Sequence, residues 1–521
     1  MTARSLTLGG QAYPLVLPNI RDPRLHVAAV IITVHVLGQV GLHFRVSVPQ
    51  ILASILTCFV IEVAITFYQT RSFVWPASAM LTGSGVALIL RVVGTPPDQP
   101  WNTFGWETFA VIGGLSLLSK YVIKYRGTHV FNPSNIGLVA AFVIAFILVG
   151  TSFIEPLDFW WAPLNVWMIT AYVVIIGGGL LITRRLKLLG LAAAFWLVLA
   201  AGVGLLSATG HCMTANWSFT PVCGADFWRV IVTSPEVMIF LFFMITDPKT
   251  TPSGRVGRVV FGAAVAIVCT LFMAPMTDEF ATKVGLLAGL VAVCAVRPLI
   301  DRFVPEPKSA MDDLSLFGRR LVGTAGRAAV AAIAVLLIGA GIVVAGTPAR
   351  GVTVPPNLEA LNRDPPIVDP STLPPITVHQ EVIDFDHTLA GEEMASVALQ
   401  LAQNLEIENV ALLRRDPSIL PAVDHGDRLV EMEARVAEAA AGEGTVLSHY
   451  DFDALDVSLL VPFGAQTGLS LGFSGTGTLT QETLDGSGAL GSSQSTPFSN
   501  TFAMRRATGD RWLIVAVLPG P

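Results

Sequence analysis

The sequence predicts an all-α polytopic membrane domain followed by a small α+β soluble domain. Of the 521 residues, 52% are hydrophobic and only 13% are charged, and the mean hydropathy is +0.63. Soluble proteins carry about 25% charged residues, so this composition indicates an integral membrane protein. The apolar character ends near Val344, and the remainder to Pro521 is polar. A net charge of −6 without a dense basic cluster argues against a nucleic-acid partner.

Apolar runs of roughly 17–25 residues, long enough to cross a lipid bilayer, determine the expected number of spans. Ten to eleven such runs follow a polar N-terminal segment, residues 1–25. Pro76 and Pro235 interrupt the third and the eighth run, and such breaks in the two halves of a chain predict a site at the centre of an inverted repeat. The runs are 26–43, 48–68, 73–93, 106–125, 132–150, 163–183, 188–207, 229–246, 257–275, 280–297 and 326–347.

Positive charge gathers in alternate loops, and this asymmetry predicts the orientation of the chain. Arg71 and Lys187 are examples of residues in the basic loops. Asp98 and Glu155 lie in loops expected on the other side of the membrane, which are poor in positive charge. Because cytoplasmic loops are the basic ones, we expect a plasma-membrane protein with a cytoplasmic N-terminus. Residues 306–325 would form a cytoplasmic linker, and the C-terminal domain would be extracytoplasmic.

A Pro-rich linker, residues 348–375, leads to the soluble domain, residues 376–521. Helical periodicity covers Glu392–Leu413 and Asp427–Ala440. Helices followed by a curved antiparallel sheet predict an α+β domain, and the order resembles the cone-shaped fold of the nuclear transport factor 2-like family. The expected strands are Val446–Phe452, Val457–Phe463, Leu469–Thr480, Phe498–Arg506 and Trp512–Leu518.

An apolar run that stops abruptly at Thr246 marks the first candidate site. The turn that follows contains Asp247, two prolines and the Thr250-Thr251 pair. Proline cannot continue a helix, and irregular backbone at membrane depth survives only where protein covers it or where it lines a cavity. Asp247 is therefore a functional candidate, with Lys249 or Arg255 as partner. The alternative is a tight cytoplasmic turn that Asp247 caps.

A second candidate site lies where an Asn-Pro pair begins a helix. Asn132 and Pro133 place the amides from Ser134 onward against whatever lies before the helix, and such an end can bind a phosphate or an anionic ring oxygen. Lys120 and His129 can supply charge or a proton. The alternative is a capped helix start with a lysine that extends to the membrane interface.

These stretches resemble the RnfD and NqrB family of membrane electron-transport subunits. The resemblance rests on Phe131-Asn132-Pro133, on the run Phe243–Pro252 with Arg255, and on Pro298-Leu299-Ile300-Asp301, and it covers about residues 26–305. It implies ten spans in two inverted repeats, built like urea channels, and a role in flavin-mediated electron transfer beside other redox subunits or a soluble reductase. The chain is also similar to the stand-alone RnfD-like proteins found beside enediyne biosynthesis genes.

The family attaches FMN to a threonine in a Ser-Gly-Ala-Thr motif, and the chain departs from the family here. No such motif is present, and the region from Gly150 to Pro163 offers only Thr151. We therefore expect FMN or riboflavin to be held without a covalent bond, with a quinone as the alternative ligand. The expected ligand-binding residues are Lys120, His129, Phe131, Asn132, Asn135, Asp247, Thr250, Thr251 and Arg255.

Two other functions remain open from the sequence. The first is a transporter or channel on the same inverted-repeat fold, since fold does not determine function. The second is a membrane scaffold whose external domain binds a partner. Its titratable residues of interest, which ordinary surface solvation also explains, are Asp384, His387, Asp424, His425 and His449.

The five cysteines show no metal-ligand spacing, and the sequence predicts no metal site. Cys58, Cys269 and Cys294 lie in apolar runs, where small core residues are expected. Cys212 and Cys223 lie in a loop assigned to the outside, where oxidation is permitted, and we expect a disulfide between them. Two free thiols are the alternative.

Overall fold

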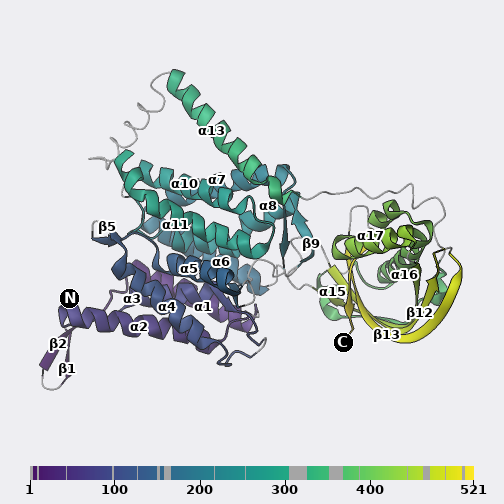
Figure 1. The fold of residues 1–521 in the computed structure, drawn as a ribbon. Helices are drawn as coiled ribbons and strands as arrows, with labels where there is room; N and C mark the ends of the chain where they lie inside the picture. The colour runs from purple at the N-terminus through teal and green to yellow at the C-terminus, as the bar shows by residue number, and fades with distance from the viewer. Residues whose placement is uncertain are drawn as a thin grey trace. The chain divides into compact units, whose positions relative to one another are not determined.

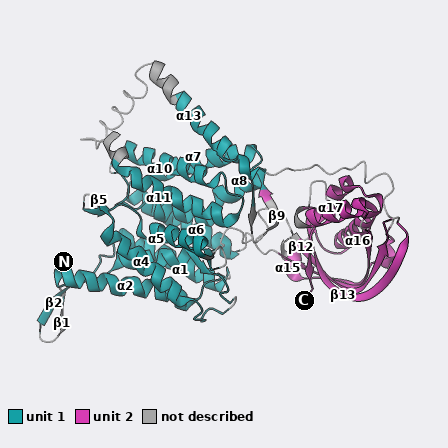
Figure 2. Cartoon of the chain, viewed as in Figure 1, with its two compact units in different colours: residues 1–213, 223–350 teal, residues 214–222, 351–521 magenta. Residues whose placement is uncertain are grey.

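The fold was established from a computed structural model of the chain. The structure describes residues 4–520 except 9–10, 43, 97–98, 126, 150–152, 158–165, 216–217, 253, 304–324, 351–367, 386–387, 443, 461–469, 487 and 507–510. The chain divides into two compact units (Figure 2). The first contains residues 1–213 and 223–350, and the second contains residues 214–222 and 351–521.

Helices dominate the first unit (Figure 1). Their bounds are α1 Pro23–Val40, α2 Val48–Thr70, α3 Ala77–Ile89, α4 Trp106–Val122, α5 Pro133–Val149, α6 Val166–Arg185, α7 Leu189–Ala208, α8 Gly224–Thr233, α9 Pro235–Ile239, the π-helical turn η2 Phe240–Met244, α10 Arg255–Met273, α11 Glu279–Phe303 and α13 Ala325–Ala345.

Seven helical segments among the described residues are long and apolar enough to cross a membrane, fewer than the expected ten to eleven. The difference lies in four helices. Helix α3 has 13 residues, because Pro76 delays its start, α4 and α5 have 17 each, and α13 counts only as the shorter apolar helix Ala332–Ala345. The expected eighth span is the broken segment Gly224–Met244. The membrane character of the chain is confirmed by these segments, which carry the apolar surface that lipid requires.

The same pattern of helix–helix contacts occurs twice within this unit. Helix α2 contacts α3 and α4, and α4 contacts α5; in the same order, α7 contacts α8 and α10, and α10 contacts α11. Helix α1 contacts α3, and α6 contacts α9 and η2. The two sets meet where α1 contacts α6 and where α5 contacts α11. The short α3 and the broken α8–α9–η2 segment therefore occupy corresponding places in the two sets.

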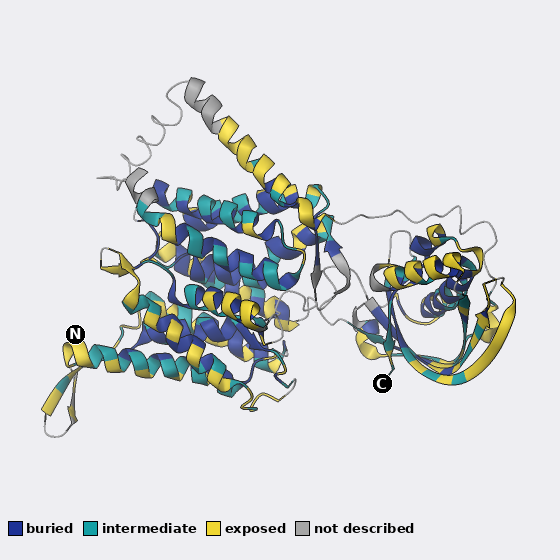
Figure 3. Ribbon diagram, viewed as in Figure 1, coloured by how far each residue is buried: buried dark blue, intermediate teal, exposed yellow. Residues whose placement is uncertain are grey.

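Burial agrees with this arrangement (Figure 3). Helix α13 contacts α7 and α10, yet most of its described residues are exposed, with Leu336 at 71%. The expected polar N-terminal segment contains a β-hairpin that the sequence analysis missed: β1 Arg4–Leu8 pairs with β2 Gln11–Val16, and β2 pairs in parallel with β3 Phe73–Val74.

The second unit is a curved five-stranded sheet against helices, as an α+β domain requires. The strand order is β10-β11-β12-β13-β14, with β10 parallel to β11 and the other pairs antiparallel. The bounds are β10 Ile376–Val378, β11 Thr445–Leu459, β12 Ser470–Leu484, β13 Leu490–Arg506 and β14 Trp512–Pro519, with helices α15 Gln380–Phe385, α16 Glu392–Arg414 and α17 Gly426–Ala441.

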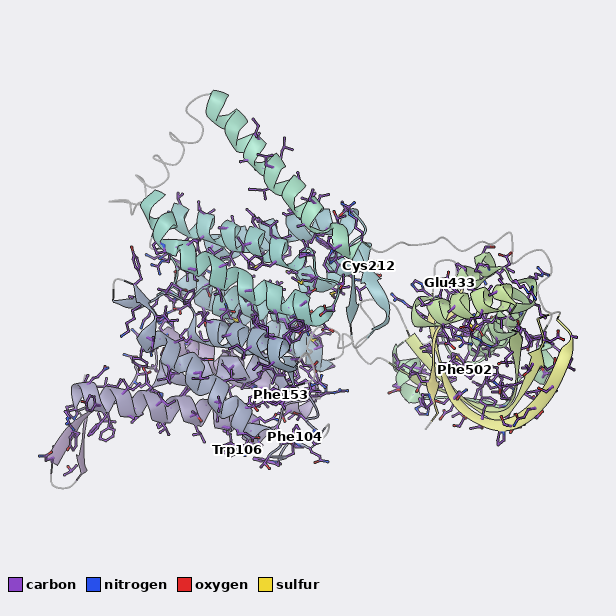
Figure 4. The ribbon with its side chains drawn as sticks, viewed as in Figure 1. Phe104, Trp106, Phe153, Cys212, Glu433 and Phe502 are labelled. Atoms are coloured by element: carbon purple, nitrogen blue, oxygen red, sulfur yellow. A yellow bond between two sulfur atoms is a disulfide. The ribbon has the colours of Figure 1, made fainter. Side chains whose placement is uncertain are left out.

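One strand assignment was wrong. The expected strands Val446–Phe452 and Val457–Phe463 are not separate strands. Residues 446–459 belong to one strand, β11, because a bulge between Phe452 and Ala454 bends the chain without ending its pairing with β12, and residues 461–463 lie outside the described part of the chain. Phe502 of β13, labelled in Figure 4, is buried in the same apolar cluster as Val397 and Leu401 of α16. Helix α16 and the sheet thus share one apolar core.

Candidate functional site

The broken segment α8–α9–η2 begins the site. Pro235 has no amide proton, so the helix is interrupted after Thr233, and the Ser234 hydroxyl caps the second part by accepting the Val237 amide at 3.1 Å. The Tyr172 hydroxyl donates to the Thr233 carbonyl at 2.9 Å, and the Trp196 indole donates to the Val232 carbonyl at 3.2 Å. Protein groups therefore satisfy the carbonyls that the break exposes.

The turn after η2 is organised around Asp247. Its carbonyl accepts the amides of Thr250 and Thr251, and its Oδ1 accepts the Lys249 amide at 3.0 Å. The other carboxylate oxygen, Oδ2, lies 3.2 Å from Nε2 of His129. The capping role that was one interpretation of Asp247 is thus present, and the second oxygen makes an additional contact with a distant part of the chain.

The start of α5 faces this turn. Asn132 caps α5: its Oδ1 accepts the Ser134 hydroxyl at 2.8 Å and the Asn135 amide at 3.3 Å. Its Nδ2 donates to the Met244 carbonyl at 3.3 Å, at the end of η2. One amide side chain therefore joins the start of α5 to the end of the π-helical turn. Such π-helical turns occur frequently at functional sites.

A cavity of about 520 Å³, called here the central cavity, lies between these elements. The N-terminal turns of α1, the small-residue helix α3, the end of α6 and the η2 region form its walls. Phe242 and Phe243 contribute aromatic surface, while His129, Asn132 and Asp247 contribute polar groups. Apolar walls with a few convergent polar groups are typical of a small-molecule site.

Charges of both signs line the central cavity. Arg24 binds Asp22 through two hydrogen bonds to Oδ2 and one to Oδ1, and these bonds lower the pKa of Asp22. Lys249 lies on the wall near Asp247. Two carboxylates and two cations therefore balance, and this lining suits a ligand with little net charge.

The structure brings only some of the predicted residues to the cavity. His129, Asn132 and Asp247 line it, whereas Phe131 and the exposed Arg255 are not among its lining residues. Other predicted residues are buried nearby without lining it. Asn135 donates to the Leu287 carbonyl at 3.0 Å, the Thr250 hydroxyl donates to the Asp247 carbonyl at 3.1 Å, and Thr251 is buried.

Lys120 has a different environment from the one expected. Its Nζ lies 2.8 Å from Oε1 of Glu62 on α2, and the Tyr121 hydroxyl donates to the same carboxylate. Lys120 does not line the central cavity. Sequence reasoning missed Glu62 and the Asp22–Arg24 pair. The Asp22-Pro23 start of α1, an N-cap followed by proline, was the signal available for the latter.

A second, smaller cavity of about 40 Å³ lies beyond the central one. At its wall, Lys283 is buried, with its Nζ 2.6 Å from Oε1 of Glu279 and 4.0 Å from Oε1 of Glu236. The lining residues that both cavities share are Leu88, Ile89, Ile239 and Met244. Four apolar side chains therefore separate the two spaces.

The loop between α7 and α8 holds the disulfide. Cys212 and Cys223 are joined, with their Cα atoms 4.1 Å apart, and close the hairpin of β8 Cys212–Ala215 and β9 Ser218–Cys223 (Figure 4 labels Cys212). The buried His211 beside it packs on the Phe227 ring at 4.3 Å, and burial lowers its pKa to about 4. Cys58, Cys269 and Cys294 are free and buried.

The titratable residues of the second unit do not form one cluster. Asp424 is buried beside Glu408 and Arg428 of the two helices, whereas Nδ1 of His449 contacts Oε1 of Glu406 at 3.0 Å. His425 is exposed, and His387 lies outside the described residues. Within the part of the chain that the structure describes, no group of three or more His, Cys, Asp or Glu residues is arranged to hold a metal ion.

A helical unit with several segments able to cross a membrane and a polar-edged central cavity defines the chain as a polytopic membrane protein. No family model matches the chain. Among curated proteins, it is 27% identical over 250 residues to the D-type subunit of the ion-translocating oxidoreductase complex of Escherichia fergusonii, covering 37% of this chain and 67% of that protein. Proteins of the same name from Escherichia coli and Salmonella arizonae are 28% and 25% identical, with the same coverage.

Proposed function

We propose that the chain is a membrane electron-transport subunit whose central cavity holds a planar redox ring, a non-covalent flavin or a quinone. The observation that carries the proposal is the meeting of the Asn132 helix start and the Asp247 turn at one cavity. The similarity to membrane components of ion-translocating oxidoreductase complexes supports it. Other redox subunits or a soluble reductase would then exchange electrons with the bound ring.

The residues at the central cavity fit such a ring. Its volume lies within the roughly 300–1,000 Å³ typical of ligand sites. Phe242 and Phe243 can contact the faces of a flat apolar ring, and Asn132 and His129 can hydrogen-bond its polar edge. A flavin or quinone would supply the electron-carrying chemistry, while the protein supplies position and electrostatics.

The test is the absorption spectrum of protein purified in mild detergent. We expect a yellow chromophore that dithionite bleaches and that acid precipitation releases, because no Ser-Gly-Ala-Thr threonine is present to retain it. Asp247→Ala and Asn132→Ala should lower its occupancy while the protein stays folded. Asp226→Ala is the matched control, since the Asp226 side chain is 42% exposed, pairs with Arg229 and is not among the residues that line the cavity.

Colourless protein that also fails to bind added flavin or quinone would count against the redox function.

The same proposal includes the orientation from the basic loops, with the N-terminus cytoplasmic and the second unit extracytoplasmic. Labelling of single exposed cysteines from either side of sealed vesicles tests this orientation independently of any cofactor.

A transporter or channel is the second candidate, and the paired cavities favour it. The two cavities adjoin through the constriction of Leu88, Ile89, Ile239 and Met244, and the far cavity is lined by the buried Lys283 and the partly buried Glu236. Ionisable residues buried in a membrane domain mark ion pathways by default. If the chain conducts, Met244→Ala should raise cation or proton flux into liposomes. Unchanged flux in Met244→Ala and Ile239→Ala would exclude this path.

A further inference from the structure

A third space, distinct from the two cavities described above, is an apolar groove that adjoins the central cavity on the outside of the helical unit. This lateral groove, of about 480 Å³, lies between α6, α7 and the broken segment. Its walls include Ile176 and Leu180 of α6, Ala193 and Trp196 of α7, and Leu241. Leu180 is 47% exposed, on a helix that is long and apolar enough to cross a membrane. The groove therefore opens toward the region that bilayer lipid would occupy.

The polar side chains that line the groove already form hydrogen bonds within the protein. The Tyr172 hydroxyl donates to the Thr233 carbonyl, and the Trp196 indole donates to the Val232 carbonyl. The remaining lining side chains are aliphatic or aromatic, apart from Thr233, whose hydroxyl donates to the Arg229 carbonyl at 2.7 Å. A hydrocarbon chain matches such a surface, whereas a polar or charged group would lose hydrogen bonds there.

Phe242 lines both the groove and the central cavity. It belongs to the π-helical turn η2, and its ring packs so closely on α6 that a Cβ added to Gly179 would overlap it. One aromatic side chain therefore separates a polar-edged cavity from an apolar groove. A ligand with a ring at one end and a hydrocarbon chain at the other would match the two spaces together.

We propose that the central cavity opens sideways to the bilayer at Phe242, and that its ligand is a ring compound with a hydrocarbon tail lying in the lateral groove. This inference rests on the proposed function and narrows it, because it selects a membrane-dissolved carrier of the lipid-quinone type over a water-soluble flavin. The ring takes its polar contacts from His129 and Asn132, and the tail takes apolar contacts from α6 and α7.

The test compares two probes on the purified full chain: a dimethoxy-methyl-benzoquinone with a decyl tail, and the same ring without the tail. Burial of the tail should make the tailed probe bind about tenfold tighter or more. Ala193→Trp, which fills the groove from α7, should remove this advantage and leave the affinity for the tailless ring unchanged. Leu180→Trp fills the groove from α6 and should act in the same way.

Leu197→Trp is the matched control, since Leu197 lies one turn further along α7, is 61% exposed and does not line the groove. Equal affinity of the two probes, or a tail advantage that persists in both groove variants, overturns the sideways opening while the redox function stands. Binding of flavin without either quinone overturns it as well. Failure of all rings to bind counts against the proposed function itself.

Discussion

Nε2 of His129 lies 3.2 Å from Oδ2 of Asp247, and this contact joins the turn before α5 to the turn after η2. The two residues are far apart in sequence and belong to different halves of the helical unit. Both side chains line the central cavity. The contact is therefore a local bridge between the start of α5 and the end of the broken segment, and it can be tested without any ligand.

The first prediction measures this bridge. In a double-mutant cycle of His129→Ala and Asp247→Ala, we expect a coupling free energy of about 0.5–1.5 kcal/mol, the net worth of one hydrogen bond. The measurement is reversible unfolding of the purified protein in mixed micelles. Additive effects of the two substitutions would show that the contact contributes nothing to stability.

The second prediction concerns Asn132, which has two separable roles. Asn132→Ala removes both the cap of α5 and the bond to the Met244 carbonyl, and should lower the free energy of unfolding by about 1–3 kcal/mol. Asn132→Asp keeps the cap acceptor but loses the donor. It should therefore be intermediate in melting temperature, and an Asp variant as unstable as the Ala variant would contradict the separation of roles.

The third prediction is that the second unit folds alone. Leu373 packs against its core, and the Pro375 carbonyl accepts the Leu455 amide at 3.1 Å, so the fragment should begin at residue 368. We expect a cooperative thermal transition by far-UV circular dichroism. A fragment that begins at residue 376 lacks both contacts and should melt at a lower temperature. Non-cooperative melting of the longer fragment would refute the prediction.

The fourth prediction follows from Asp424. Burial, and then the charge of Glu408, raises the pKa of Asp424 well above its ordinary value of 3.8. Because the folded state holds this proton more tightly than the unfolded state, the contribution of Asp424 to stability is full below about pH 3.8 and is lost as the pH rises toward the folded pKa. Asp424→Asn mimics the protonated form.

The Asn variant should therefore lose stability less steeply than the wild type as the pH rises above about 4. Thermal melting of the second unit across pH 4–8 provides the measurement. Asp453→Asn, at an exposed site on β11, is the control and should leave the slope unchanged. Identical slopes for Asp424→Asn and the wild type would show that Asp424 does not retain its proton.

The fifth prediction concerns the disulfide. Alkylation of denatured protein without reductant, followed by mass spectrometry, should label Cys58, Cys269 and Cys294 but neither Cys212 nor Cys223. The three free cysteines serve as the internal control. Replacing the pair by serine should destabilise the hairpin by about 2–3 kcal/mol in the chain-entropy model. Labelling of all five residues would refute the disulfide and would count against the proposed placement of this loop outside the cytoplasm.

Much of the fold could be predicted because hydropathy and periodicity are local properties of the chain. The Asn132 and Asp247 turns were recognisable because proline breaks are visible in sequence, although their contact with each other is not. Lys120 was assigned to the site because its ion-pair partner, Glu62, lies on another helix and no local pattern links them. The β11 bulge was mistaken for a turn because local polarity cannot distinguish the two.

The N-terminal hairpin was also missed, and the reason is physical. Its strands are short and mixed in polarity, and their pairing with Phe73–Val74 is a tertiary contact. The lateral groove could not be predicted either, because it arises from the spacing of three elements. Leu180, Ala193 and Leu241 each fit an ordinary apolar helix when they are considered singly.

The interruption at Pro235 also constrains how the chain is made. The carbonyls of Val232 and Thr233 accept hydrogen bonds from Trp196 of α7 and Tyr172 of α6, and both donors precede them in synthesis. In hydrocarbon, each unsatisfied carbonyl would cost several kcal/mol. The broken segment, which also carries Glu236, therefore inserts stably only after α6 and α7 are in the membrane. For this segment, the two helices that supply the donors thus come first along the chain, as the bilayer requires.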